Sequence, residues 1–320
     1  MLKGFVRDAA AALLLLLSLA AASAVVLSPR DYRVGFESLL ATWADFVRDV
    51  DHIGLSVTRI PAEEEMQIRA AMARQLSFEE ETGTPRAFYV GVVGANLIRL
   101  GGVRRTDISY HFHLLRDSSV INAWAMPGGH IFITTGMLSM ITSEAQLASV
   151  LAHEISHVDL RHAVERLQYE AAMRRVVGDI AELSGIAYGL VDIAYSTQEE
   201  SEADRTGFLM MARTGYSPVE AITLFRAMQL ALERPSEVTR PAGPLGELST
   251  GLGAALQDYF RTHPSFADRI ADLRQLLAEN DSSWRSKMFC VGTSNLRDLV
   301  TCMDERRDAE WVPVDASQLK

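Results

Sequence analysis

The chain has 320 residues, 48% of them hydrophobic, and carries a formal net charge of -10 at pH 7. This length and composition allow a substantial buried core, arranged as one large domain or two small ones. The acidic balance, in a sequence with no basic run, excludes the electrostatic footprint of a nucleic-acid-binding protein. We therefore expect no nucleic acid among its partners.

The N-terminus has the pattern of an export signal. Lys3 and Arg7 precede an uncharged apolar stretch over residues 9–27, and Ala22-Ser23-Ala24 supplies a small-x-small cleavage pattern. The same stretch is just long enough to cross a bilayer. We interpret residues 1–24 as a signal peptide or an N-terminal membrane anchor, and expect the remainder of the chain outside the cytoplasm.

The segments that follow differ in how clearly they predict structure. Residues 31–80 have a loosely helical pattern of apolar positions, whereas residues 87–103 are apolar but interrupted by four glycines and remain unassigned. Three strand signals then follow with turn signals between them, over residues 108–115, 120–126 and 131–135. We expect these strands to form a small antiparallel or mixed sheet.

The next element is a helix that contains His153-Glu154-Ile155-Ser156-His157. It begins at a capping-box pattern, Ser143-Glu144-Ala145-Gln146, and continues with apolar residues at helical spacing. Residues four apart lie on one face, so His153 and His157 can bind one metal ion while Glu154 points toward a water molecule at that ion. Catalytic zinc needs three protein ligands and an open position, so a third ligand must be found.

Residues 199–204, Glu-Glu-Ser-Glu-Ala-Asp, start a second helix and offer the missing ligand. We choose Glu200, because Glu200 and Asp204 share a helical face and Asp204 can then accept the free N–H of a ligand histidine. Glu199 is the weaker rival. Glu202 lies roughly 200° around the helix from Glu200, so both cannot face the metal.

Other candidates near these motifs are weaker. Arg205, directly after Asp204, could orient or neutralise the carboxylates, although a solvated arginine is the ordinary interpretation. Several histidines lack a recognisable ligand spacing and are interpreted as structural or exposed, namely His52, His111, His113, His130 and His162.

Cys290 and Cys302 are the only cysteines, and both lie beyond the metal-binding motifs. An even pair in an exported chain favours a disulfide that closes a short loop, while two unpaired thiols are the alternative. No histidine lies near either cysteine in sequence, so neither is a candidate nucleophile.

These motifs resemble the HtpX-like and BepA-like zinc metallopeptidases of the gluzincin clan, in a periplasmic branch without a helical repeat domain. The second motif of that family is a glutamate followed three and four residues later by Ala-Asp, which Glu200, Ala203 and Asp204 match. Further blocks in the same order extend the resemblance over most of residues 108–270. They are Tyr110-His111-Phe112-His113, Asn122-Ala123-Trp124-Ala125-Met126-Pro127-Gly128-Gly129-His130-Ile131, Gly215-Tyr216-Ser217-Pro218 and Thr262-His263-Pro264.

The resemblance implies an α+β, zincin-like fold, mostly helical with a small antiparallel or mixed sheet beside the active-site helix. It places a zinc metallopeptidase domain at residues 25–280, with its catalytic core at residues 108–280, and leaves residues 281–320 as a C-terminal tail. One zinc ion per chain is expected at the histidine motif, with Glu154 as the general base that activates water for peptide hydrolysis.

The resemblance also implies two roles that the residues alone do not establish. His263 lies in the Thr-His-Pro block that family members place near the metal, where it could stabilise the oxyanion, ligate zinc or make a structural hydrogen bond. In such peptidases an edge strand beside the active helix pairs with extended substrate. Our candidate for that strand is Asn122, Ala123, Trp124 and Ala125, and the alternative is that it is only sheet core.

From the resemblance we expect a zinc endopeptidase in the periplasm or at the extracytoplasmic face of the membrane. It would act in protein quality control on unfolded or misassembled envelope proteins, with membrane association through its N-terminus. The alternative is a chaperone-like or self-inhibited zinc-binding protein of the same fold, in which His263 or the Pro- and Gly-rich loop over residues 234–253 blocks the metal. The intact Glu154 favours the enzyme.

Overall fold

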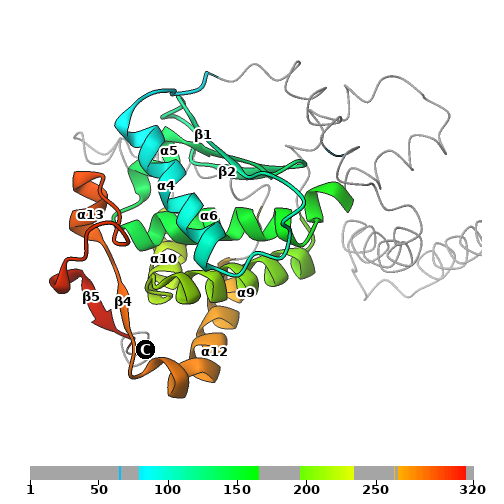
Figure 1. Ribbon diagram of the computed structural model, residues 1–320. Helices are drawn as coiled ribbons and strands as arrows, with labels where there is room; N and C mark the ends of the chain where they lie inside the picture. The colour runs from blue at the N-terminus through cyan, green and yellow to red at the C-terminus, as the bar shows by residue number, and fades with distance from the viewer. Residues whose placement is uncertain (1–64, 66–78, 166–194, 234–262, 264–265, 315–320) are drawn as a thin grey trace, which may run out of the picture. The chain divides into compact units, whose positions relative to one another are not determined.

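The computed structural model describes residues 65, 79–165, 195–233, 263 and 266–314 (Figure 1). Our expectations for residues 1–24, for nearly all of residues 31–80 and for the loop over residues 234–253 lie outside them. No helix in the described ranges has both the length and the apolarity needed to cross a membrane. The described part is mostly helical with a small mixed sheet, which confirms the α+β fold class.

Helix α4, Pro85–Leu100, covers most of the segment that is unassigned from sequence. Thr84 caps its first turn and is followed by proline, whose missing N–H would have no helical partner at that position. Gly94 is required by packing, because a Cβ there would lie 2.3 Å from the ring of Phe112 in strand β1, His111–Leu115. A glycine that weakens the helix prediction thus lets the helix approach the sheet.

Three short strands form the sheet, namely β1 (His111–Leu115), β2 (Ala123–Met126) and β3 (His130–Thr134). Their order is β1-β3-β2, with β3 parallel to β1 and antiparallel to β2. β2 and β3 are joined by a tight turn in which Gly128 and Gly129 both have a φ of 83°. The short helix α5, Thr135–Met140, follows β3. The predicted strands are confirmed with shorter bounds, and the sheet is mixed.

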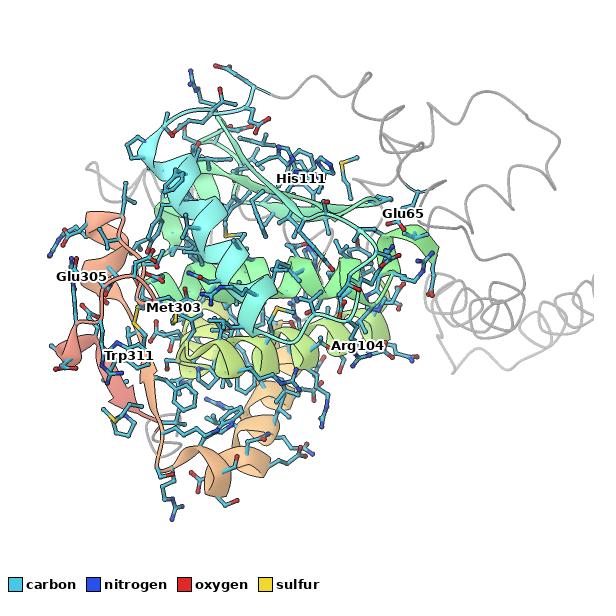
Figure 2. All side chains as sticks on the ribbon, viewed as in Figure 1. Glu65, Arg104, His111, Met303, Glu305 and Trp311 are labelled. Carbon is cyan, nitrogen blue, oxygen red and sulfur yellow. A yellow bond between two sulfur atoms is a disulfide. The ribbon has the colours of Figure 1, made fainter. Side chains whose placement is uncertain are left out.

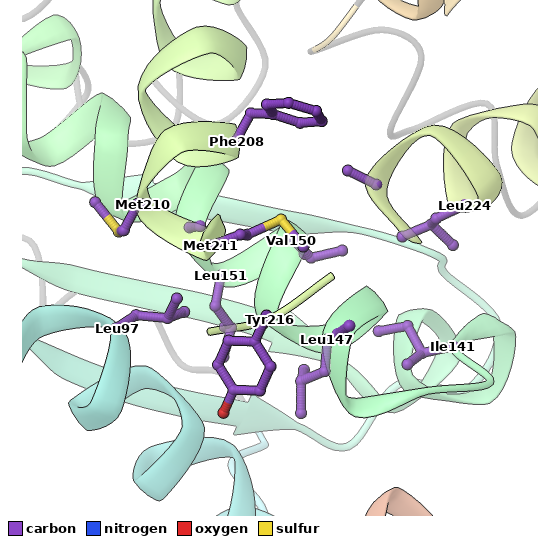
Figure 3. Packing of buried hydrophobic residues seen from close by; sticks show 14 of the residues in the cluster. Leu97, Ile141, Leu147, Val150, Leu151, Phe208, Met210, Met211, Tyr216 and Leu224 are labelled. Carbon is purple, nitrogen blue, oxygen red and sulfur yellow. The ribbon is translucent and has the colours of Figure 1, made fainter. Parts of the chain in front are cut away.

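Helix α6, Glu144–Asp159, carries the histidine motif through the centre of the core. The Ser143 hydroxyl caps it by accepting a hydrogen bond from the Gln146 amide at 3.2 Å, which confirms the predicted start. Every residue of α6 is buried, because α4 and the sheet pack on one side and later helices on the other (Figure 1). Figure 3 shows Leu147 and Val150 of α6 among the core side chains.

Three longer helices complete the core, namely α9 (Thr197–Thr214), α10 (Val219–Glu233) and α12 (Phe266–Trp284). Helix α9 begins in a capping box formed by Ser196 and Glu199, and it packs along α6. Gly207 permits this packing, since a Cβ there would lie 3.0 Å from the backbone nitrogen of His153. The close approach brings the acidic side chains of α9 to the histidines of α6.

Most of residues 281–314, within the expected C-terminal tail, fold against the start of α6. They form strands β4 (Met288–Cys290) and β5 (Trp311–Pro313), helix α13 (Thr293–Asp298) and the 3-10 turn η1 (Asp308–Glu310). Cys290 and Cys302 are joined by a disulfide. The Gly292 carbonyl accepts a hydrogen bond from the Glu144 amide, and the Glu144 carboxylate accepts one from the Cys302 amide at 3.0 Å. The disulfide-closed loop is therefore part of the support of α6.

We expect a Cys290→Ala/Cys302→Ala protein to be about 3 kcal/mol less stable than wild type, because a disulfide between residues 12 apart restricts the unfolded chain. Urea unfolding followed by circular dichroism measures the difference. A reducing agent should destabilise the wild type by a similar amount and leave the double variant unchanged. A wild type that unfolds at the same urea concentration with and without reductant would contradict this expectation.

Candidate metal centre

Four buried side chains from separate parts of the chain converge on one point. His153 and His157 lie one turn apart on α6, with their Nε2 atoms 3.0 Å apart. Glu200, in the first turn of α9, places Oε2 3.5 Å from His153 Nε2 and Oε1 3.4 Å from His157 Nε2. His263 Nδ1 lies 2.8 Å from Glu200 Oε1 and 3.3 Å from His153 Nε2. One potential ligand atom from each lies within 4.8 Å of the others, an arrangement that can hold a metal ion.

The donor set and its surroundings fit zinc. Two imidazole nitrogens and one carboxylate oxygen are ligands of catalytic zinc sites. Asp204 Oδ1 lies 2.9 Å from His153 Nδ1, so it holds the proton on Nδ1 and leaves the Nε2 lone pair for a metal. Burial lowers the pKa of His157 well below its ordinary value, so this imidazole is neutral, as a ligand must be.

The other acidic residues of the α9 motif and the neighbouring arginine point elsewhere. The Glu199 carboxylate accepts a backbone hydrogen bond at 2.7 Å in the capping box. Glu202 Oε2 lies 3.6 Å from His162 Nε2. Arg205 is 62% exposed, and its guanidinium lies 3.8 Å from Glu279, which matches the ordinary interpretation of a solvated arginine.

Glu154 is fully buried beside this group, and neither of its carboxylate oxygens has a hydrogen-bond partner among the described residues. Its Oε1 atom lies 3.7 Å from His263 Nε2, and burial raises the pKa of the carboxyl group. A buried carboxylate without donors costs free energy, so such a group indicates a partner beyond the described side chains. A water molecule or a substrate proton is such a partner, and Glu154 has the surroundings of a general base.

Arg269, which the sequence analysis does not select, holds two of the carboxylates. From α12 it donates to both Asp204 oxygens at 2.7 Å, and its NH1 atom lies 3.1 Å from Glu200 Oε2. Burial by itself would raise the pKa of Asp204, but Arg269 outweighs this effect and keeps that pKa below its ordinary value. A sequence signal exists, because Arg269 is three residues after Phe266 and four before Leu273, on the apolar face of its helix.

Two further side chains that sequence reasoning missed contact His157. The Tyr195 ring stacks on its imidazole with centroids 3.8 Å apart, and His162 Nδ1 lies 3.0 Å from His157 Nδ1. His162 is buried beside a candidate ligand, which its sequence spacing does not reveal. The other described histidines lie in the sheet outside this group, namely His111, His113 and His130, while His52 lies outside the described residues.

The candidate substrate strand lies at one margin of the sheet. Within the described residues, β2 pairs with β3 on one side and packs beside α6. The Asn122 side chain accepts a hydrogen bond from the Ala123 amide at 2.9 Å. Ala123 and Ala125 are buried and Trp124 is half-buried. The position of β2 at the edge of the sheet suits substrate pairing, and the burial of Ala123 and Ala125 suits sheet core.

A buried helix with two histidines, packed between a small sheet and an acidic helix, defines the class of protein as a zincin-like metallopeptidase. A sequence model of Peptidase family M48 matches residues 86–277, more than half of the chain. The protein belongs to peptidase family M48, which confirms the resemblance drawn from its motifs. The family match covers α6 and α9, the two helices that carry most of the candidate metal centre.

Individual relatives agree with this assignment. The chain is 31% identical over 204 residues to the mitochondrial metalloendopeptidase OMA1 of Schizosaccharomyces pombe, covering 61% of this chain and 54% of that protein. It is 30% identical over 204 residues to the beta-barrel assembly-enhancing protease of Escherichia coli (strain K12), covering 58% and 38%. The match to OMA1 of Arabidopsis thaliana has 29% identity over 174 residues and covers 51% and 30%. The chain thus spans about half or less of the length of these relatives.

Proposed function

We propose that the protein is a metalloendopeptidase that uses one zinc ion per chain to cleave unfolded or misassembled proteins of the cell envelope. The observation that carries the zinc part is the convergence of His153, His157 and Glu200 beside the buried Glu154. The envelope part is supported by the name of the Escherichia coli relative, which refers to β-barrel assembly, and by the export-like pattern of residues 1–24. On this support we propose that the catalytic part lies in the periplasm or at the extracytoplasmic face of the membrane, with membrane association through the N-terminus.

The proposed mechanism divides the work between the ion and the protein. Bound zinc supplies Lewis acidity, which lowers the pKa of water and polarises a peptide carbonyl. Glu154 takes the proton from the attacking water and passes it to the leaving amine. Asp204 keeps His153 in the tautomer that offers Nε2, and Arg269 keeps Asp204 ionised. Burial of the group excludes bulk water and strengthens these electrostatic interactions.

A second candidate function is a self-inhibited or chaperone-like zinc-binding protein. It is favoured by the position of His263, whose Nδ1 atom lies 2.8 Å from Glu200 Oε1 and so stands where substrate would need room. In the active enzyme, the same histidine would donate to the oxygen that gains negative charge during attack.

A cleavage assay on the full chain tests the proposed function. We expect the purified protein to contain zinc and to cleave unfolded casein, with activity lost on chelation and restored by added zinc. In His263→Ala we expect unchanged zinc content and a kcat lower by about 10²-fold, the effect of losing one oxyanion donor. Higher turnover in His263→Ala would favour self-inhibition. A zinc-loaded protein that cleaves nothing in either form would favour the chaperone-like role.

We propose β2 as the strand that pairs with extended substrate. The Thr134 amide donates to the Asn122 carbonyl at 3.0 Å, so by the antiparallel alternation Ala123 and Ala125 direct their backbone groups away from β3. We expect Ala125→Pro to raise KM about 5-fold with less effect on kcat, because one hydrogen bond is worth about 1 kcal/mol. Ala125→Ser, which keeps the N–H, is the control. An unchanged KM in Ala125→Pro would leave β2 as sheet core.

We also propose residues 25–280 as the metallopeptidase domain, with residues 108–280 as its catalytic core. The family match over residues 86–277 supports these bounds at the C-terminal end and adds α4 to the part shared with the family. Residues 281–320 contribute the disulfide-closed loop that packs on the start of α6.

A further inference from the structure

His162 follows the end of α6, where the chain takes an unusual turn. Arg161 has a φ of 70°, a left-handed conformation that bulky side chains rarely adopt. Without this turn, His162 could not contact His157. In a continuous helix, a residue five positions beyond His157 would lie about 140° around the helix axis from it. The chain instead brings His162 Nδ1 to 3.0 Å from His157 Nδ1, with His162 only 3% exposed.

Buried charges hold this turn in place. Asp159, the last residue of α6, accepts hydrogen bonds from the backbone amides of Arg104 and Arg105 at 2.8 and 2.7 Å. Glu65 accepts two hydrogen bonds from the Arg105 guanidinium and lies 3.8 Å from that of Arg161. Figure 2 shows Glu65 and Arg104 around this end of the helix. A rare backbone conformation with several supporting contacts indicates a function for the side chain that it places.

The contact between the two imidazoles determines where their protons lie. His157 directs Nε2 toward the candidate metal position, 3.4 Å from Glu200 Oε1, so as a neutral ligand it carries its proton on Nδ1. That Nδ1 donates to His162 Nδ1, which must be unprotonated, and His162 therefore carries its proton on Nε2. Glu202 Oε2 lies 3.6 Å from this Nε2. Glu202, on the wrong side of α9 for the metal, thus faces the histidine behind the second ligand.

We propose that His162 is a positioning residue for His157, whose tautomer and ring orientation it sets for metal binding. This inference rests on the proposed zinc centre. It parallels the action of Asp204 on His153, with one chemical difference. A carboxylate makes its imidazole a stronger donor to a metal, whereas the neutral His162 leaves His157 close to an ordinary imidazole. The two histidine ligands are therefore unequal.

A matched pair of substitutions tests the role of His162. Asn places a carbonyl oxygen near the position of His162 Nδ1, whereas Leu has the same branching and no acceptor. We expect zinc affinity, measured by competition with a chromophoric chelator, to fall about 10- to 100-fold in His162→Leu and to stay near wild type in His162→Asn. The visible absorption of the cobalt-substituted protein should change in His162→Leu only. Wild-type affinity in His162→Leu, or equal losses in both variants, would overturn the proposal.

A measurement on the unaltered protein covers the case in which His162→Leu does not fold. Nitrogen-15 NMR of the zinc-loaded wild type distinguishes protonated from unprotonated imidazole nitrogens. We expect the proton on Nε2 of His162 and on Nδ1 of His157, and a proton on Nδ1 of His162 would overturn the proposal. A wild type that binds no zinc would instead show that the proposed function fails, and the inference with it. Failure of the inference alone is seen only in a protein that binds zinc.

Discussion

Replacing Glu154 with Gln is expected to abolish peptide hydrolysis while leaving zinc bound. Gln has nearly the same shape but cannot take a proton from water, and a general base of this kind contributes about 10²- to 10⁴-fold to the rate. The proposed metal ligands His153, His157 and Glu200 are unchanged in this variant, so zinc content should equal that of wild type. Metal analysis and the kcat for unfolded casein, measured on the same preparation, check both parts.

The matched control for this variant is Glu279→Gln, which makes the same chemical change at a half-exposed position on α12. It should retain wild-type kcat and zinc content. Turnover in Glu154→Gln close to that of the control would remove Glu154 from the mechanism. Loss of zinc in Glu154→Gln would show that Glu154 supports the metal centre rather than the proton transfer.

Replacing Arg269 with Met is expected to lower the free energy of unfolding by about 3–5 kcal/mol, the usual effect of breaking a buried ion pair from one side. Asp204 and the guanidinium are each 4% exposed, and Glu200 lies 3.1 Å from the same arginine. Without Arg269, two carboxylates would remain buried with less positive charge beside them. Urea unfolding in the presence of a chelator measures this effect without a contribution from zinc.

A double-mutant cycle separates the ion pair from packing. We expect Arg269→Met/Asp204→Asn to lose less stability than the sum of the two single variants, because the second substitution removes the uncompensated charge. Arg205→Met is the control, since Arg205 is 62% exposed and its contact with Glu279 should contribute no more than about 1 kcal/mol. If Arg269→Met costs no more than Arg205→Met, the buried pair does not stabilise the fold.

The helix of the histidine motif and the three strands could be predicted because their signals are local. The Ser143 hydroxyl caps α6 by accepting a hydrogen bond from the Gln146 amide, three residues further along the chain. Each strand is a short apolar run with turn residues at its ends. Residues 87–103 could not be assigned because their glycines weaken a helix prediction. The reason for Gly94 is its close approach to the ring of Phe112 on β1, and the local sequence does not reveal this contact. The parallel pairing of β1 with β3 likewise depends on how separate segments meet.

Some residues of the candidate site could likewise be predicted from local spacing, and others could not. The i, i+4 spacing within α6 and within α9 led to the two histidines and to Glu200 with Asp204. The sequence analysis missed Arg269, His162 and Tyr195. The position of Arg269 on the apolar face of its helix does indicate a buried charge, which needs partners. His162 was hidden because helical spacing places it far from His157, and the turn at Arg161 changes that relation.

By itself, the sequence determined the class of fold and led to the two histidines and Glu200 of the candidate metal centre, because capping, helical spacing and strand alternation act between residues close in the chain. The tertiary structure alone brought Arg269 and His162 to that centre. His153 meets His263 and Arg269 across 110 and 116 residues of sequence, and His162 reaches its partner only through a left-handed turn. Such contacts form when helices pack and bury their polar groups together, so a local sequence pattern does not predict them.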